Sequence, residues 1–133
     1  MKISYILDYG NGSPIGRETH TQTITPEGFV NDLADCRTFL LDSEAVELRR
    51  QGLGTRTTTA DLLVIGPNGP INNRFRHGNE LVRHKILDIV GDLSLLGVDL
   101  CGHVVAYRSG HPLNIELLQA LTAPVERRER VAA

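Results

Sequence analysis

Tryptophan is absent from the sequence, and aromatic residues make up only 5% of its 133 residues. Proteins that bind single-stranded RNA by stacking its bases need exposed rings, so this class is disfavoured. The chain has two cysteines, Cys36 and Cys101, which are too few for a disulfide framework. Their apolar neighbours predict buried thiols. Neither sign of charge dominates, since the net charge is −2, and no nucleic-acid partner is indicated.

Long hydrophobic runs are also lacking, so the sequence predicts no membrane span. An acidic residue and a glycine already occur within the first ten residues, where a secretory signal peptide would have an uninterrupted apolar segment. We therefore expect a cytoplasmic protein. Hydrophobic residues make up 41% of the chain and charged residues 23%, a balance typical of one globular domain with its own core.

Hydrophobic periodicity, turn residues and caps predict alternating strands and helices. Strands are expected at 2–8, 17–24, 37–41, 57–65, 71–74 and 103–108, and helices at 26–36, 42–50, 79–96 and 113–122. Asp42 and Ser43 are expected to cap the second helix. This order favours an α+β fold, a two-layer sandwich in which a mixed β-sheet packs on helices. We expect a single domain over residues 1–122 and a charged tail at 123–133.

The longest predicted helix carries a row of polar residues beside its apolar face. His84 and Asp88 are four residues apart and so share a face, and both residue types bind zinc. Asp92 lies one turn further along. The alternative is a solvated stripe in which Lys85 is an ordinary surface charge paired with Asp88. Three further histidines fit no ligand pattern: His20, His77 and His103.

Four other residues suit chemistry but also have a plain structural interpretation. His111 follows a strand and precedes Pro112 at a helix start, where it is either an acid/base group or a helix cap. Thr38 is either a donor to an oxyanion or an ordinary strand residue. Asp8 and Tyr9 offer an acceptor and a stacking ring, or they merely end the first strand.

Three segments together resemble a known family. They are RHKILDIVGD at 83–92, AYRSGHPLN at 106–114 and CRTFLL at 36–41. They resemble the motifs of the zinc-dependent UDP-3-O-acyl-N-acetylglucosamine deacetylases of lipid A biosynthesis, over about residues 1–122. That family has two similar α+β domains with the metal between them, and this chain resembles the second domain. The resemblance also implies an inserted strand-helix-strand element at about 38–66 that forms the passage for the acyl chain.

The resemblance implies catalytic roles for five residues. His84 and Asp88 would bind Zn²⁺, with Fe²⁺ as an alternative metal. His111 would be the catalytic imidazole that stabilises charge and protonates the leaving amine. Asp92 would orient His111, and Thr38 would contact the developing oxyanion.

The resemblance also implies a substrate, UDP-3-O-acyl-N-acetylglucosamine, and four residues that contact it. Lys85 would hold the substrate, and Phe39 would line the region of the sugar and acyl chain. Asp8 and Tyr9 would lie near the uridine.

One family feature is missing from the sequence. The third zinc ligand and the general base of the family form a Glu-His dipeptide in the first domain, and this chain has no such dipeptide. We therefore expect a catalytic half that needs a first domain in trans or a second copy of itself. The alternative is a non-catalytic module that binds a UDP-sugar or an acyl chain and self-associates. Leu40 and Pro112 also stand where the family has small residues.

Overall fold

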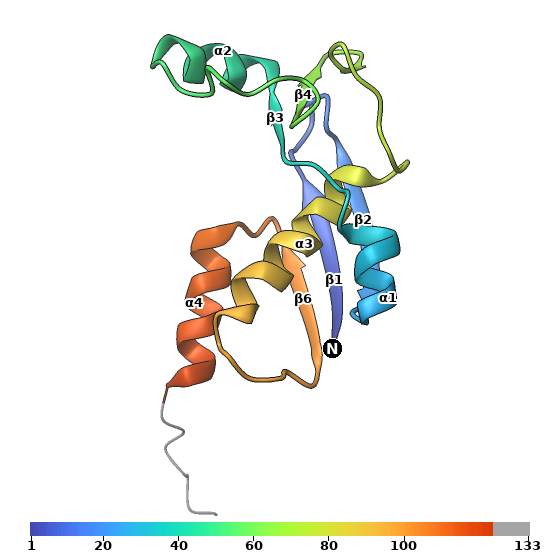
Figure 1. Ribbon diagram of the computed structural model, residues 1–133, viewed down its shortest axis with the longest axis vertical. Helices are drawn as coiled ribbons and strands as arrows, with labels where there is room; N and C mark the ends of the chain where they lie inside the picture. Colours follow the sequence, from blue (N-terminus) through green and yellow to red (C-terminus); the bar gives the residue numbers. More distant parts are fainter. Residues whose placement is uncertain (124–133) are drawn as a thin grey trace, which may run out of the picture.

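The computed structural model describes residues 1–123 (Figure 1). Most of the predicted tail therefore lies outside the described residues. The strands are β1 (Lys2–Asp8), β2 (Arg17–Thr23), β3 (Phe39–Leu41), β4 (Leu63–Gly66), β5 (Gly69–Pro70) and β6 (His103–Tyr107). The helices are α1 (Pro26–Gly28), the π-helix η1 (Phe29–Leu33), α2 (Asp42–Arg50), α3 (Glu80–Ser94) and α4 (His111–Thr122). Their order along the chain agrees with the prediction.

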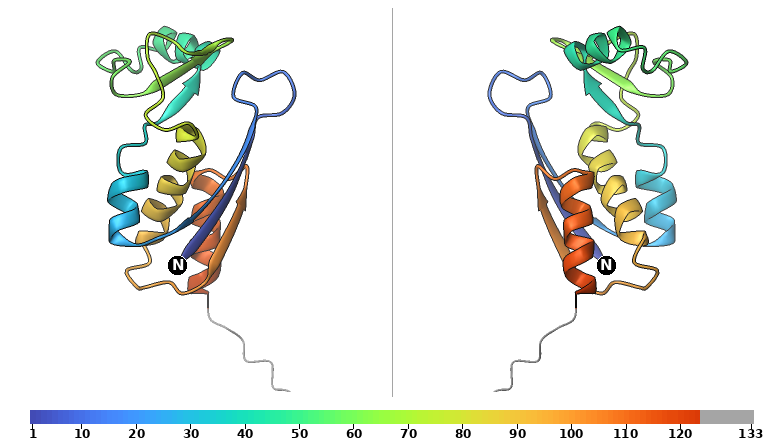
Figure 2. Two further views of the ribbon diagram at one scale, coloured as in Figure 1. Left: turned by 90° about the vertical axis from the view of Figure 1, so that its right-hand side faces the viewer. Right: turned by 90° about the vertical axis from the view of Figure 1, so that its left-hand side faces the viewer.

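The main layer is a three-stranded sheet in the order β2-β1-β6, in which β1 is antiparallel to β2 and parallel to β6. The helices α1, α3 and α4 all lie on one face of this sheet (Figure 2). Alternate residues of β1 point to that face, so Ile3, Tyr5 and Leu7 are buried. They form one core with the apolar face of α3. The predicted α+β fold with a mixed sheet packed on helices is confirmed.

The inserted strand-helix-strand element is confirmed as a separate small sheet. Its strands are ordered β3-β4-β5, with β3 parallel to β4, and α2 lies beside them at the top of Figure 1. The expected cap of α2 is wrong, because Glu44 rather than Asp42 or Ser43 makes it. The carboxylate of Glu44 accepts a hydrogen bond of 2.8 Å from the N–H of Leu41.

Two predicted strands are wrong in extent. The strand at 57–65 shrinks to β4 because Asp61 accepts hydrogen bonds of 2.9 and 2.8 Å from the N–H and hydroxyl of Thr58, and such local bonds compete with strand pairing. The strand at 71–74 is absent because Asn72 has φ of +51°, which strand backbone does not allow. The strand that returns antiparallel to β4 is instead β5, at Gly69–Pro70.

Two further expectations need correction. Helix α4 begins at His111 rather than 113, because extended Gly110 is already the cap of the helix. This places His111 in the first turn of α4. Both cysteines were expected to be buried. Cys36 is buried, but Cys101 is exposed. Cys101 lies in the loop between α3 and β6.

A buried ion pair joins the inserted element to the main layer. Arg37, just before β3, donates from Nε to Oε1 of Glu80 at 2.9 Å and from Nη2 to Oε2 at 3.1 Å. Glu80 begins α3, and its side chain is fully buried. The backbone N–H groups of Arg37 and Arg76 also donate to this carboxylate. This clamp fixes where β3 stands relative to the start of α3.

Candidate functional site

Helix α3 presents the two predicted metal ligands on one face. Nε2 of His84 lies 3.2 Å from Oδ1 of Asp88. Both side chains are largely buried, with 11% and 13% of their surface exposed. Nitrogen and oxygen ligands of one tetrahedral zinc ion, at bond lengths of about 2.0–2.2 Å, lie about 3.3–3.6 Å apart, close to this spacing. The pair therefore fits a metal ion as two of its ligands.

A backbone carbonyl and an aromatic ring fix the orientation of His84. Nδ1 of His84 lies 3.2 Å from the carbonyl oxygen of Cys36, which accepts the proton on Nδ1 and leaves Nε2 with a free lone pair. The ring of Phe39 meets the imidazole edge-on, with centroids 6.0 Å apart. Tyr9 packs on Phe39 in turn, at 6.1 Å. These contacts hold Nε2 of His84 beside Asp88.

Lys85 forms the ion pair with Asp88 that was expected if Lys85 does not contact a substrate. Its Nζ donates to Oδ2 of Asp88 at 2.6 Å. One oxygen of Asp88 therefore faces the lysine while the other faces His84. Lys85 is mostly buried, and its ion pair also orients the carboxylate of Asp88.

Asp92 and His111 meet where α3 passes the start of α4. Nδ1 of His111 lies 2.8 Å from Oδ2 of Asp92, and Nδ2 of Asn114 donates to the same oxygen at 2.8 Å. Asp92 is 15% exposed, whereas His111 is 67% exposed. The carboxylate thus orients the imidazole and leaves Nε2 on the side of the ring away from Asp92. A histidine held in this way can pass a proton at Nε2 while the carboxylate stabilises the charged ring.

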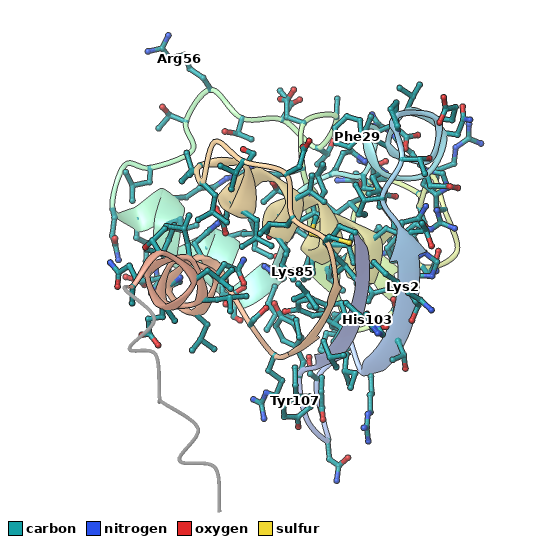
Figure 3. All side chains as sticks on the ribbon, turned by 90° about the horizontal axis from the view of Figure 1, so that it is seen from below. Lys2, Phe29, Arg56, Lys85, His103 and Tyr107 are labelled. Atoms are coloured by element: carbon teal, nitrogen blue, oxygen red, sulfur yellow. The ribbon has the colours of Figure 1, made fainter. Side chains whose placement is uncertain are left out.

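A cleft opens beside α3, near the ends of β1 and β6. Its lining includes Tyr5, Asp8, Tyr9, Lys85, Arg108 and Ser109. In the view from below, Lys85 lies between α4 and strands β1 and β2 (Figure 3). Two hydrogen bonds, from the N–H of Gly10 and from the hydroxyl of Tyr107, hold the pKa of Asp8 below its usual range. The cleft therefore offers cations and a fixed carboxylate acceptor, a set that suits an anionic ligand with hydroxyl groups.

Thr38 lies between the Arg37 clamp and Phe39, at the entrance to β3. Its side chain is exposed, and its carbonyl oxygen accepts a hydrogen bond of 2.8 Å from the N–H of Leu63. Within residues 1–123, no side-chain hydrogen bond joins Thr38 to the other predicted site residues. The structure therefore leaves the hydroxyl free to meet a ligand but does not bring it onto His84 or His111.

Sequence reasoning missed several groups that support the site. The hydroxyl of Tyr5 donates to the carbonyl of Ser109, two residues before His111, and burial raises the pKa of Tyr5. Asn114 lies one turn after His111 on α4, and that spacing is a signal that could have identified it. The carbonyl of Cys36 gives no signal in the sequence, because it is a backbone group 48 residues away from His84.

One of the histidines that fitted no pattern belongs to a cluster. His77 lies with Asp35 and Cys36, and the ligand atoms of all three are within 4.8 Å of one another. Burial raises the pKa of the Cys36 thiol to about 11. His77 lies 41 positions after Cys36, so spacing in the sequence could not predict that these residues meet.

Comparison with known proteins identifies a family that this chain is similar to. The model of the UDP-3-O-acyl N-acetylglycosamine deacetylase family matches residues 1–123. The UDP-3-O-acyl-N-acetylglucosamine deacetylase of Chlamydia trachomatis is 42% identical over 118 residues, which cover 88% of this chain and 41% of the relative. The Chlamydia caviae protein of the same name is also 42% identical, over 88% of this chain and 42% of the relative. The chain thus spans about two fifths of the length of these relatives. Among the described residues, no helix has the length and apolar character needed to cross a membrane.

Proposed function

This chain belongs to the UDP-3-O-acyl N-acetylglycosamine deacetylase family, and from that premise we propose that it supplies two metal ligands and the acid of such a deacetylase. The reaction would be the removal of acetate from UDP-3-O-acyl-N-acetylglucosamine in lipid A biosynthesis, in the cytoplasm. One observation carries the proposal. The His84–Asp88 pair and the Asp92–His111 pair follow each other along α3, and both are already formed.

His84 and Asp88 would hold the metal, and the donor set of imidazole and carboxylate suits Zn²⁺, with Fe²⁺ as the alternative. When bound, the ion would polarise the acetamide carbonyl and activate water. The Cys36 carbonyl keeps Nε2 of His84 free for this role. Lys85 orients Asp88 through its second oxygen.

His111 would serve the leaving amine. In its charged form it carries a proton on Nε2, which passes to the amine nitrogen as the C–N bond breaks. Asp92 accepts the bond from Nδ1 throughout and so stabilises the charged ring. Asn114 holds the carboxylate in that position. The exposed hydroxyl of Thr38 would donate to the oxyanion.

The cleft and the inserted element would bind the substrate. Lys85 and Arg108 offer positive charge to a diphosphate. Asp8 would accept from a uridine or ribose group, and Tyr9 would stack beside it. Phe39 contacts both Tyr9 and His84 and so would line the region between the sugar and the metal.

The proposed site needs a partner. A catalytic zinc has three protein ligands as a rule, and α3 offers two. The third ligand and the general base would come from a first domain, supplied in trans, or from a second copy of this chain.

A chimera tests the proposal directly. This chain replaces the matching segment of the Chlamydia trachomatis relative, and acetate release from UDP-3-O-acyl-N-acetylglucosamine is measured. We expect activity that His111→Ala lowers by about 10²–10⁴-fold and that His84→Ala abolishes. His103→Ala is the matched control, because His103 contacts Ser4 on the outer face of the sheet. A folded, metal-loaded chimera with no acetate release, or one indifferent to both site variants, would refute the proposal.

A second function is favoured by one observation. Side chains of the inserted element alone form an apolar hollow, lined by Leu40, Ala45, Leu48, Leu53 and Val64 among others. A module that only binds an acyl chain or a UDP-sugar needs no first domain. Calorimetry of the isolated chain with a UDP-acyl-glucosamine separates the two functions. Tight binding without metal, together with an inactive chimera, would favour the binding module.

A further inference from the structure

A second cluster of metal-ligating side chains lies away from the cleft. Asp35 and Cys36 are in the turn after η1, and His77 is in the loop before α3. Nε2 of His77 lies 2.7 Å from Oδ1 of Asp35, and Sγ of Cys36 lies within 4.8 Å of both ligand atoms. The cluster thus brings one nitrogen, one oxygen and one sulfur atom together from two segments.

The two segments are held in place by contacts that do not use these ligand atoms. The N–H of Cys36 donates to the carbonyl of Leu33 at 2.9 Å. The next residue, Arg37, is fixed by Glu80. On the other side, Arg76 donates to the carbonyl of Asp35 from its guanidinium and to Glu80 from its N–H. The backbone of both segments is therefore positioned in advance, so an ion need not order it.

The chemistry of the three atoms selects a class of ion. Magnesium and calcium prefer oxygen ligands throughout, whereas zinc and cobalt accept sulfur, nitrogen and oxygen together. Ligand atoms around a tetrahedral zinc ion lie about 3.3–3.8 Å apart, so the present spacing needs only side-chain adjustment. Cys36 is buried, while half of the Asp35 side chain is exposed. An ion can therefore enter from the Asp35 side.

We propose that Asp35, Cys36 and His77 form a second site for a divalent transition-metal ion, with water in the fourth position. This site is separate from His84 and Asp88 and does not depend on the proposed deacetylase function. When it fills, a metal–sulfur bond forms and the proton of the Cys36 thiol leaves for solvent. The hydrogen bond between His77 and Asp35 opens, and both atoms turn to the ion.

Cobalt(II) titration tests the proposal because only this site contains sulfur. The exposed Cys101 is first replaced, so the starting protein is Cys101→Ser. We expect a near-ultraviolet thiolate-to-cobalt charge-transfer band that saturates at one equivalent. The double variant His84→Ala/Asp88→Ala is the matched control, and we expect it to keep the band.

Two variants at the surface keep the test decisive even if a change at buried Cys36 disturbs folding. His77→Ala and Asp35→Ala each remove one ligand from a partly or well exposed side chain, and circular dichroism checks their fold. We expect each to weaken cobalt binding by about tenfold or more. Absence of the band in Cys101→Ser, or a band that neither surface variant weakens, would overturn the proposal.

Discussion

Replacing Arg37 tests whether the buried clamp fixes the inserted element to α3. The Glu80 side chain is 0% exposed and that of Arg37 is 8% exposed. Arg37→Met removes the donors Nε and Nη2 and leaves a buried carboxylate with two backbone donors. Breaking a buried ion pair in this way costs about 3–5 kcal/mol. This is a large part of the roughly 5–15 kcal/mol that stabilises a domain.

A second substitution should partly rescue the first. In Arg37→Met/Glu80→Gln the unpaired group is a neutral amide, which is cheaper to bury than a carboxylate. We expect the double variant to be more stable than Arg37→Met by about 1 kcal/mol or more. Urea unfolding followed by circular dichroism measures both changes.

An exposed ion pair provides the control. Arg50 and Glu47 lie 3.8 Å apart on α2, and their side chains are 75% and 58% exposed. Arg50→Met should therefore change the free energy of unfolding by less than about 0.5 kcal/mol. The reasoning would be refuted if Arg37→Met cost no more than Arg50→Met, or if the two buried substitutions destabilised additively.

Three further predictions follow from the geometry. Burial favours the neutral acid of Glu80, but hydrogen bonds from Arg37 and the backbone outweigh it and hold its pKa below the usual 4.5. Because the pKa of Glu80 is lower in the folded state, the ionised carboxylate stabilises the fold above its unfolded pKa. The free energy of unfolding should therefore fall as the pH drops through the folded pKa. A free energy from urea unfolding that stays constant between about pH 5 and pH 3 would contradict this. Asn114→Ala should lower the kcat of the chimera about tenfold with unchanged zinc content, because Asp92 loses a positioning partner; an unchanged kcat would exclude that role. Exposed Leu113 and Leu121 on α4 should make the isolated chain self-associate, and light scattering that shows a monomer at high concentration would refute this.

The sequence predicted the main layer well because its signals are local. The apolar face of α3 repeats every three to four residues and emerges as the buried face of one helix. A local signal also starts α1, since the hydroxyl of Thr25 accepts a hydrogen bond of 3.0 Å from the N–H of Gly28. Strand extent failed in the region 57–74, where side-chain hydrogen bonds and the positive φ of Asn72 decide the backbone.

The site was predictable only in part, and for a similar reason. Helical spacing alone placed His84 and Asp88 together, and the structure puts their ligand atoms 3.2 Å apart. The family resemblance, rather than any spacing, paired Asp92 with His111. The clamp at Glu80 and the cluster around His77 join segments about 40 residues apart. No periodic pattern records such contacts, and they appear only once the chain is folded.

Zinc content tests the proposed metal site on α3 most directly. The chimera is purified in an Asp35→Ala/His77→Ala background, so that the second proposed site keeps only one of its three ligands. We predict one zinc per chain, lost in His84→Ala and in Asp88→Ala and kept in His103→Ala. Zinc that remains in both ligand variants would show that the ion binds elsewhere and would contradict the account.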